Sequence, residues 1–196
     1  MGKDILSSLR PAIVMTILFA ILLGIAYPLA MTGIGQAIFL RAANGSLIRD
    51  DRGQVIGSDV IGQAFTADRY FQTRPSAAGK GYDGLASAGS NLGPTSRALA
   101  DRVKADVEKR RAEGVAGPVP ADLVTTSGSG LDPDLSPASA MAQVSRVARV
   151  RALDERRVRD LVSRNVERPL LGFLGEARVN VLALNRQLDQ LGGSTR

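Results

Sequence analysis

Glycine-flanked lysine, serine and aspartate residues are the groups in this sequence whose spacing invites a chemical interpretation. Gly79-Lys80-Gly81 has the composition of a phosphate-binding loop, but a Walker A motif requires glycine at position 74 and Ser or Thr at position 81. Gly128-Ser129-Gly130 lacks the third glycine of a dinucleotide-binding turn. Asp132-Pro133-Asp134 lacks the spacing of a calcium loop and indicates a turn. These motifs predict no bound metal and no firmly bound cofactor.

A serine activated by a lysine is the one catalytic arrangement that the composition leaves open, with Lys80, Lys104 or Lys109 as the base. The 196 residues include no Cys and no His. This composition excludes a thiol nucleophile, a Cys-ligated zinc or iron–sulfur site, and a Ser-His-Asp triad. No motif surrounds any of the three lysines. A membrane-tethered extracytoplasmic Ser–Lys-type hydrolase is therefore the alternative to a protein without catalytic residues.

The basic character of the chain is spread over its length. Lys and Arg number 25 against 19 Asp and Glu, which gives a net charge of +6. The most basic stretch, from Arg146 to Arg168, holds eight Arg interleaved with four acidic residues. A nucleic-acid-binding surface would concentrate its basic residues in one stripe. The pattern instead indicates solvated helix surfaces and predicts no nucleic-acid partner.

An uncharged segment of thirty residues, Pro11 to Leu40, contains 22 apolar residues. About 20 apolar residues span the hydrocarbon core of a bilayer as a helix. Ala30-Met31-Thr32 is a poor signal-peptidase site, so the sequence favours an uncleaved single-pass anchor over a signal peptide. Tyr27 and Pro28 lie towards the far end of the anchor. The small residues Ala20, Gly24 and Ala26 would allow a neighbouring helix to approach closely.

The rest of the chain is predicted to form a single mixed domain, which makes the fold class α+β with one N-terminal transmembrane helix. Residues 47–61 resemble short strands around a turn at 51–53, and the aromatic residues between 65 and 82 are expected to form a core cluster. Helices are expected over about 96–113, after Ser136-Pro137, from Asp154-Glu155 and over 179–191. In the second of these, Val144, Val147 and Ala148 would face inward, and Arg146 and Arg149 outward. Long Gly/Ser-rich loops fill 74–94 and 125–137.

Several short motifs occur along the chain in a characteristic order. They include Gly24-Ile25-Ala26-Tyr27-Pro28, GSDVIGQAF at 57–65, Gly89–Pro94, SGSGLDP at 127–133, and VNVLALN at 179–185. In this order they resemble the C subunit (KdpC) family of the Kdp potassium-transporting P-type ATPase of bacteria. Asp134 and Leu135 depart from the family pattern, in which His or Asn is followed by Ile.

The resemblance implies a non-catalytic accessory subunit of an ATP-driven, high-affinity potassium uptake complex. In such a complex a channel-like subunit translocates potassium and a P-type ATPase subunit is phosphorylated, so ATP and K⁺ are handled by the complex. The family is described as stabilising assembly and as a catalytic chaperone that raises the ATP affinity of the pump subunit. The resemblance also implies an inner-membrane protein in contact with lipid. Residues 1–11 would be cytoplasmic, 12–34 would form the transmembrane helix, and 35–196 the extracytoplasmic domain.

The resemblance also suggests functional residues. Gln143 matches a glutamine proposed to contact nucleotide, but ATP is not available outside the cytoplasm, so we favour a helix-surface or loop-bracing amide. The anchor residues expected to pack on partner helices are Ala20, Gly24, Ala26, Tyr27 and Pro28. The loop residues expected to dock on partners are Arg74, Pro75, Tyr82, Ser90, Asn91, Ser129 and Asp132.

Overall fold

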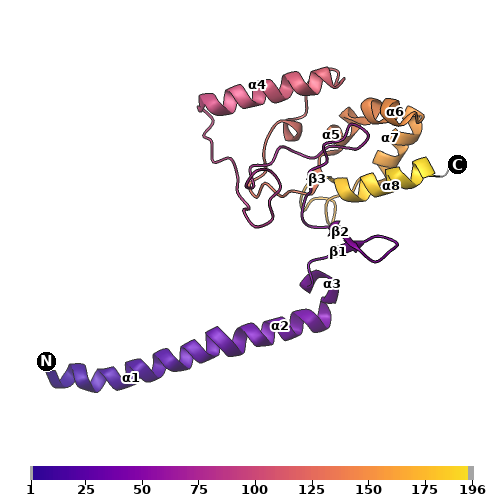
Figure 1. Cartoon of the computed structure of the whole chain (residues 1–196). Helices are drawn as coiled ribbons and strands as arrows, with labels where there is room; N and C mark the ends of the chain where they lie inside the picture. Colours follow the sequence, from indigo (N-terminus) through magenta and orange to yellow (C-terminus); the bar gives the residue numbers. More distant parts are fainter. Residues whose placement is uncertain (1, 194–196) are drawn as a thin grey trace. The chain divides into compact units, whose positions relative to one another are not determined.

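The chain divides into two units, residues 1–47 and 48–196, in the computed structural model (Figure 1). The structure describes residues 2–193, and the side chains of residues 7–192. Met1, at the start of the predicted cytoplasmic segment, and residues 194–196, at the end of the predicted soluble domain, lie outside the described residues. Each unit is described separately below.

The N-terminal unit is a long apolar helix followed by one short turn of helix. It comprises α1 (Gly2–Ile21), a π-helical turn η1 (Leu22–Ala26), α2 (Tyr27–Ile38) and α3 (Leu40–Ala43). The segment Ser7–Ile38 has a mean hydropathy of 2.4 in its most apolar window, and the side chains of that window are exposed. It is long and apolar enough to cross a bilayer. The predicted apolar N-terminal helix is confirmed, and it continues beyond residue 34 to Ile38.

The π-helical turn lies directly before Pro28, near the middle of the apolar segment. The backbone N–H of Tyr27 donates to the carbonyl of Leu22, five residues earlier, and Pro28 occupies the first turn of α2. A proline in a helix interior clashes with the carbonyl four residues before it, and the wider turn provides room for the ring. Pro28 itself has no N–H to donate to a carbonyl of this turn.

The second unit begins with a two-stranded hairpin. Strands β1 (Leu47–Arg49) and β2 (Val55–Ser58) pair with each other. Asp50 organises the turn between them, because its Oδ1 accepts from Arg52 N at 3.0 Å and from Gln54 N at 2.8 Å. These bonds are typical of an Asx turn. The predicted pair of strands around residues 51–53 is confirmed.

Helices form most of the regular secondary structure of the second unit. They are α4 (Arg97–Ala112), the 3₁₀ turn η2 (Ala121–Leu123), α5 (Pro137–Ala142), α6 (Val144–Arg151), α7 (Glu155–Arg164) and α8 (Val181–Gly193). Helices α5–α8 pack together (Figure 1) around an apolar core that includes Val144, Val147, Val158, Leu184 and Leu188. A two-residue antiparallel pair, β3 (Asp134–Leu135) with β4 (Val179–Asn180), joins the loop before α5 to the start of α8. The sequence analysis missed this pair.

The helix starts predicted at Ser136-Pro137 and at Asp154-Glu155 are confirmed, and a side chain caps each of them. Ser136 Oγ accepts from Ser139 N at 3.1 Å at the start of α5. Asp154 Oδ1 accepts from Arg156 N at 2.7 Å at the start of α7. Each cap satisfies a backbone donor that the helix itself leaves unpaired. The capping residues therefore identified both helix starts correctly.

Residues 68–73, a turn at 68–70 followed by three residues without regular secondary structure, lie against the core and are called the central segment below. At Phe71, which is fully buried, Asn185 Nδ2 donates to the carbonyl and Asn185 Oδ1 accepts from the N–H, each at 2.9 Å. At the next residue, Gln143 Nε2 donates to Gln72 O at 3.0 Å and Gln143 Oε1 accepts from Gln72 N at 2.8 Å. The two side-chain amides thus bond the backbone as a neighbouring strand would.

Arg146 completes the hydrogen bonding of the central segment. Its guanidinium donates to Asp68 O at 2.5 Å, to Tyr70 O at 3.1 Å and to Gln143 Oε1 at 2.7 Å. Arg146 is buried, so the prediction that it faces outward is wrong. The backbone carbonyls need a donor inside the domain, and burial lowers the pKa of the Arg146 guanidinium. Val144, Val147 and Ala148 are buried and Arg149 is exposed, as predicted.

Substitution of Asn185 tests this arrangement. Asn185→Ala leaves both backbone groups of Phe71 buried and unpaired, and each such group costs about 1–3 kcal/mol. We expect the unfolding temperature of the purified full chain, measured by scanning calorimetry, to fall by roughly 5–15 °C. Gln190→Ala, five residues away on the exposed side of α8, should change the free energy of unfolding by less than about 0.5 kcal/mol. Equal effects of the two substitutions would contradict the assignment.

Candidate functional site

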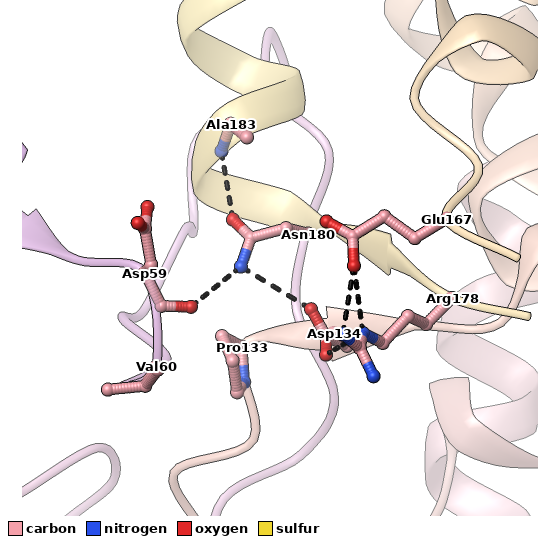
Figure 2. Close-up of a pocket in the computed structure, with 8 residues that line it drawn as sticks. All are labelled: Asp59, Val60, Pro133, Asp134, Glu167, Arg178, Asn180 and Ala183. Atoms are coloured by element: carbon pink, nitrogen blue, oxygen red, sulfur yellow. Dashed lines mark hydrogen bonds and ion pairs between the residues drawn. The ribbon is translucent and has the colours of Figure 1, made fainter. Parts of the chain in front are cut away.

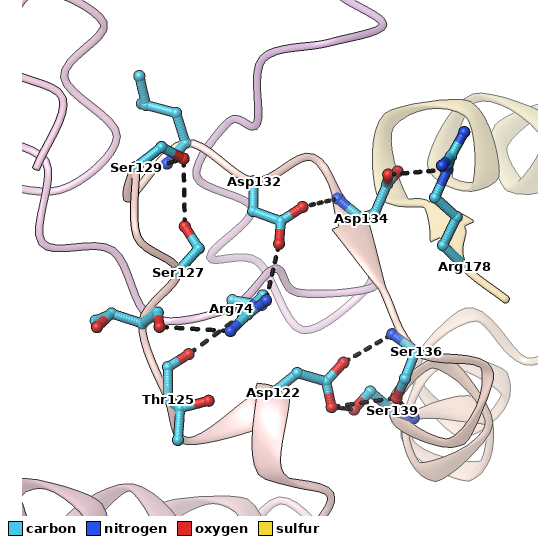
Figure 3. A network of polar contacts seen from close by, with 12 residues as sticks. Arg74, Asp122, Thr125, Ser127, Ser129, Asp132, Asp134, Ser136, Ser139 and Arg178 are labelled. Carbon is cyan, nitrogen blue, oxygen red and sulfur yellow. Dashed lines mark hydrogen bonds and ion pairs between the residues drawn. The ribbon is translucent and has the colours of Figure 1, made fainter. Parts of the chain in front are cut away.

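The two long loops that were predicted to dock on partners meet each other at Arg74 and Asp132. Arg74 Nη1 lies 2.8 Å from Asp132 Oδ2, and both side chains are largely buried (Figure 3). The same guanidinium donates to the carbonyls of Thr125 and Thr126, each at 3.4 Å. Arg74 therefore braces the second loop against the first, which is a different role from that of an exposed docking residue.

Tyr82 and Ser76 continue this bracing. Tyr82 OH donates to Arg74 O at 2.5 Å, and Ser76 Oγ donates to Gly130 O at 2.6 Å while accepting from Tyr82 N at 2.8 Å. Burial raises the pKa of the Tyr82 hydroxyl above its ordinary value. Gly130 has a φ of +67°, and a Cβ there would lie 2.6 Å from Ala78 N and 2.7 Å from Ala88 O. The approach of the two loops thus requires a glycine at this position.

The remaining predicted loop residues lie around this contact. Ser129 O accepts from Ala88 N and from Ser87 Oγ, each at 3.0 Å, which adds a second link between the loops. Pro75 is half-buried and lines a cavity of about 240 Å³ together with Tyr82. Ser90 is half-buried and Asn91 is exposed, with a φ of 52°. The structure brings Arg74, Tyr82, Ser129 and Asp132 together, whereas Ser90 and Asn91 lie outside the network.

Asp122 is a structural residue that the sequence analysis missed. Its carboxylate accepts from Ser136 N at 2.7 Å, from Ser136 Oγ at 3.1 Å and from Ser139 Oγ (Figure 3). These bonds hold the η2 turn against the start of α5. The serine hydroxyls at this helix start are thus engaged in structural bonds, and no local pattern around Asp122 predicts them.

A second polar cluster surrounds a cavity of about 500 Å³ beside the β3–β4 pair (Figure 2). Arg178 bridges two carboxylates, with Nε 3.2 Å from Asp134 Oδ2 and Nη2 2.9 Å from Glu167 Oε2. Asn180 Nδ2 donates to Asp59 O at 2.9 Å and to Asp134 Oδ1 at 3.4 Å. Burial raises the pKa of the Asp134 carboxyl, and the nearby Arg178 charge opposes that shift. Among the described residues, no three His, Cys, Asp or Glu side chains are placed to hold a metal ion.

Gln143 is buried, with 1% of its surface exposed. Its carbonyl accepts from Gln72 N and Arg146 Nη2, and its amide donates to Gln72 O and, at 3.4 Å, to Ser139 O. These four bonds use both acceptor sites and both protons of the side chain. The expectation of a bracing amide is confirmed, and that of a helix-surface amide is wrong. A nucleotide contact would require the amide to release the central segment.

The lysines considered as catalytic bases lie on the surface. Lys80, Lys104 and Lys109 are all exposed, and Lys109 Nζ is 3.9 Å from Glu113 Oε1. A lysine that serves as a general base is desolvated or placed next to another cation. None of the three has such surroundings, so the geometry does not support the Ser–Lys alternative.

Comparison with known families gives the decisive observation. Residues 9–190 match the model of the family described as KdpC: K⁺-transporting ATPase, c chain. The chain belongs to the KdpC family. This match covers both units, the apolar helix as well as the domain with the braced loops.

Similar proteins extend along nearly the whole chain. The Potassium-transporting ATPase KdpC subunit of Caulobacter vibrioides is 58% identical over 184 residues, which are 94% of this chain and 93% of the relative. The protein of the same name from Methylobacterium nodulans is 56% identical over an alignment of 200 positions, which covers 96% of this chain and 99% of the relative. The one from Rhodopseudomonas palustris is 55% identical over 196 residues, covering 94% and 98%. This KdpC-family chain is therefore similar to its relatives from end to end.

The predicted packing residues of this KdpC-family anchor cluster around the π-helical turn. Ala20 precedes the turn, Gly24 and Ala26 lie in it, and Tyr27 and Pro28 begin α2. A Cβ built on Gly24 meets no atom within 4 Å, so the backbone of this turn is open to a neighbour. The anchor thus offers a bare backbone surface in the middle of the apolar segment.

The pKa of Asp134 gives a pH-dependent prediction. A carboxyl group whose pKa is higher in the folded than in the unfolded protein stabilises the fold while it is protonated. This stabilisation is lost as the pH rises from about 4, the pKa in the unfolded chain, through the higher pKa in the folded protein. Asp134→Asn removes this loss. The free energy of unfolding of the variant should therefore exceed that of the wild type by an amount that grows with pH and stays below about 1 kcal/mol at pH 7. Denaturant unfolding of the full chain in detergent over this range measures the difference. Asp51→Asn in the exposed hairpin turn is the control. A difference in unfolding free energy that shrinks as the pH rises would show that the Arg178 charge affects the pKa of Asp134 more than burial does.

Proposed function

We propose that this chain is a non-catalytic accessory subunit of an ATP-driven potassium uptake complex and stabilises its assembly. The observation that carries the proposal is the match to the KdpC family over residues 9–190. Relatives that cover nearly the whole chain are named Potassium-transporting ATPase KdpC subunit. The exposed lysines and the structural roles of Gln143 and Asp122 agree with a protein whose polar residues hold a scaffold together.

The partners in this proposal are a channel-like potassium-translocating subunit and a P-type ATPase subunit of the same complex. The Ser7–Ile38 helix would cross the inner membrane once, with the N-terminus in the cytoplasm and the domain on the extracytoplasmic side. The mutually braced loops at 74–94 and 125–135 would then present a fixed surface to the channel-like subunit. ATP and K⁺ would be bound by the partners.

The π-helical turn supports a specific contact within the membrane. A backbone carbonyl without a donor costs several kcal/mol in hydrocarbon, and the missing N–H of Pro28 would leave a carbonyl of this turn in need of a donor. Gly24 leaves the turn uncovered on its own side. A partner helix carrying a hydroxyl or amide donor would satisfy the carbonyl and pack against Ala20, Gly24 and Ala26.

A chaperone effect on ATP affinity is part of the proposal, and it would be transmitted through the subunit contacts. An effect of this kind is a coupling free energy between distant sites and needs no nucleotide near this domain. Gln143 would have no part in this effect beyond keeping the domain folded, since its hydrogen bonds are all used within the core.

A substitution at the π-helical turn tests the proposed assembly contact. Gly24→Leu places a large side chain over the open backbone, and we expect recovery of the partner subunits in a pull-down from native membranes to fall about tenfold, as a loss of about 1.4 kcal/mol would produce. Ala12→Leu adds similar bulk near the start of the apolar segment and should leave recovery unchanged. Undiminished recovery with Gly24→Leu, or failure of the wild-type chain to recover a P-type ATPase, would contradict the proposal.

Substitution of Gln143 separates a structural role from nucleotide contact. Gln143→Ala leaves Gln72 N–H and C=O unpaired in the core, so we expect a loss of about 2–5 kcal/mol in unfolding free energy. At a temperature where the variant remains folded, the KM for ATP of the assembled complex should be unchanged. Gln190→Ala, exposed on α8, controls both measurements. A higher KM for ATP without any loss of stability would instead indicate direct contact with nucleotide.

A further inference from the structure

The chain between α7 and β4 forms a turn that exposes four large apolar side chains. These are Leu170, Leu171, Phe173 and Leu174, with 66%, 77%, 78% and 58% of their surfaces exposed. Residues 169–174 are called the apolar turn below. A soluble domain rarely exposes a contiguous apolar patch of this kind unless the patch binds another surface.

The apolar turn is held in shape by its own backbone. Leu170 and Leu174 exchange hydrogen bonds at 3.1 and 2.9 Å, and Gly172 N donates to Pro169 O at 3.0 Å. Leu171 and Gly172 have φ values of 55° and 81°, which fold the tip back on itself. Polar backbone groups that are paired internally can leave water at little cost. These bonds satisfy the backbone at the base of the turn, and the carbonyls at its tip would lie at the level of the lipid headgroups, where water is present.

Charged side chains mark the base of the apolar turn. Glu167 and Arg178 exchange backbone hydrogen bonds at 2.8 and 3.1 Å, and their side chains form an ion pair at 2.9 Å. Arg168 is exposed beside them. An apolar tip above a charged base is the distribution expected at the boundary between lipid and water.

The apolar turn is close to the place where the chain enters the domain. Its base lines the 500 Å³ cavity opposite Asp59 and Val60, which follow β2 directly (Figure 2). Strand β2 pairs with β1, the first element of the domain after the apolar helix. Val60 is itself 61% exposed. Within the domain, the base of the apolar turn thus lies across this cavity from the residues that follow the entry hairpin.

We propose that the apolar turn inserts into the surface of the lipid bilayer in which the chain is anchored. It would give the domain a second membrane contact and restrict its rotation about the anchor. Lipid fits the turn better than a protein partner does, because residues 169–175 offer no side-chain hydrogen bond that would fix the register of a specific interface. The proposal rests on the anchor alone and does not require the other subunits, so its test is independent of assembly.

Single tryptophan residues provide the test, since the natural sequence contains none. Phe173→Trp is introduced into the full chain, which is reconstituted alone in phosphatidylcholine–phosphatidylglycerol vesicles with or without brominated acyl chains. We expect a blue-shifted emission and about a twofold loss of intensity with the brominated lipid. Leu85→Trp is the control, because Leu85 is fully exposed in the polar 74–94 loop and its emission should stay unquenched.

A second variant and the partner subunits complete the experiment. Leu171→Asp in the Phe173→Trp background should abolish quenching without changing the unfolding temperature, because Leu171 is outside the core. Phe173→Trp emission that stays solvent-like in vesicles would overturn the proposal. Emission that becomes shielded only when the other subunits are reconstituted with the chain would also overturn it, and would assign the apolar turn to a protein interface.

Discussion

The central segment lies against the core with its backbone bonded to side chains, and the positions of α6 and α8 depend on this bonding. Unpaired N–H and C=O groups at Phe71 and Gln72 would each cost free energy comparable to a lost hydrogen bond. Asn185 and Gln143 each pair both groups of one residue, and Arg146 caps two further carbonyls. Val144 and Leu184 belong to the same apolar core as Phe71, so the packing of α6 and α8 and the hydrogen bonding of the central segment form together.

The need to pair buried backbone groups also explains why polar residues that resemble catalytic or ligand-binding residues have structural roles here. Gln143 uses its whole hydrogen-bonding capacity inside the domain, and Arg74 is occupied by Asp132 and two carbonyls. With little sheet of its own, the domain uses side chains where other folds use neighbouring strands. Its loops are consequently fixed by cross-links such as Ser76 to Gly130, which suits a protein that offers a rigid surface to others.

The features that the sequence predicted are those determined by neighbouring residues. The inward positions of Val144 and Val147 follow from helical spacing, and the caps Ser136 and Asp154 act on the next few residues. The burial of Arg146 depends on carbonyls 76 and 78 positions away, so its charge misled the prediction. The β3–β4 pair likewise joins Asp134 to Asn180. Its strands are too short to show a periodic pattern, and they are far apart in the sequence. The docking of the candidate loop residues on partners stays a prediction, and their bracing contacts depend on the meeting of two loops that are distant in the sequence.

The π-helical turn has a consequence for the geometry of the anchor. It inserts one residue into the helical repeat, and one residue corresponds to a rotation of about 100°. A stripe of side chains that continues at regular spacing from Ala20 in α1 therefore turns away from the stripe that α2 presents after Pro28. The two halves of the anchor face different directions, so a single straight neighbouring helix cannot follow one face of the anchor along its whole length. Each half of the anchor would contact a different neighbour, one in each leaflet of the membrane.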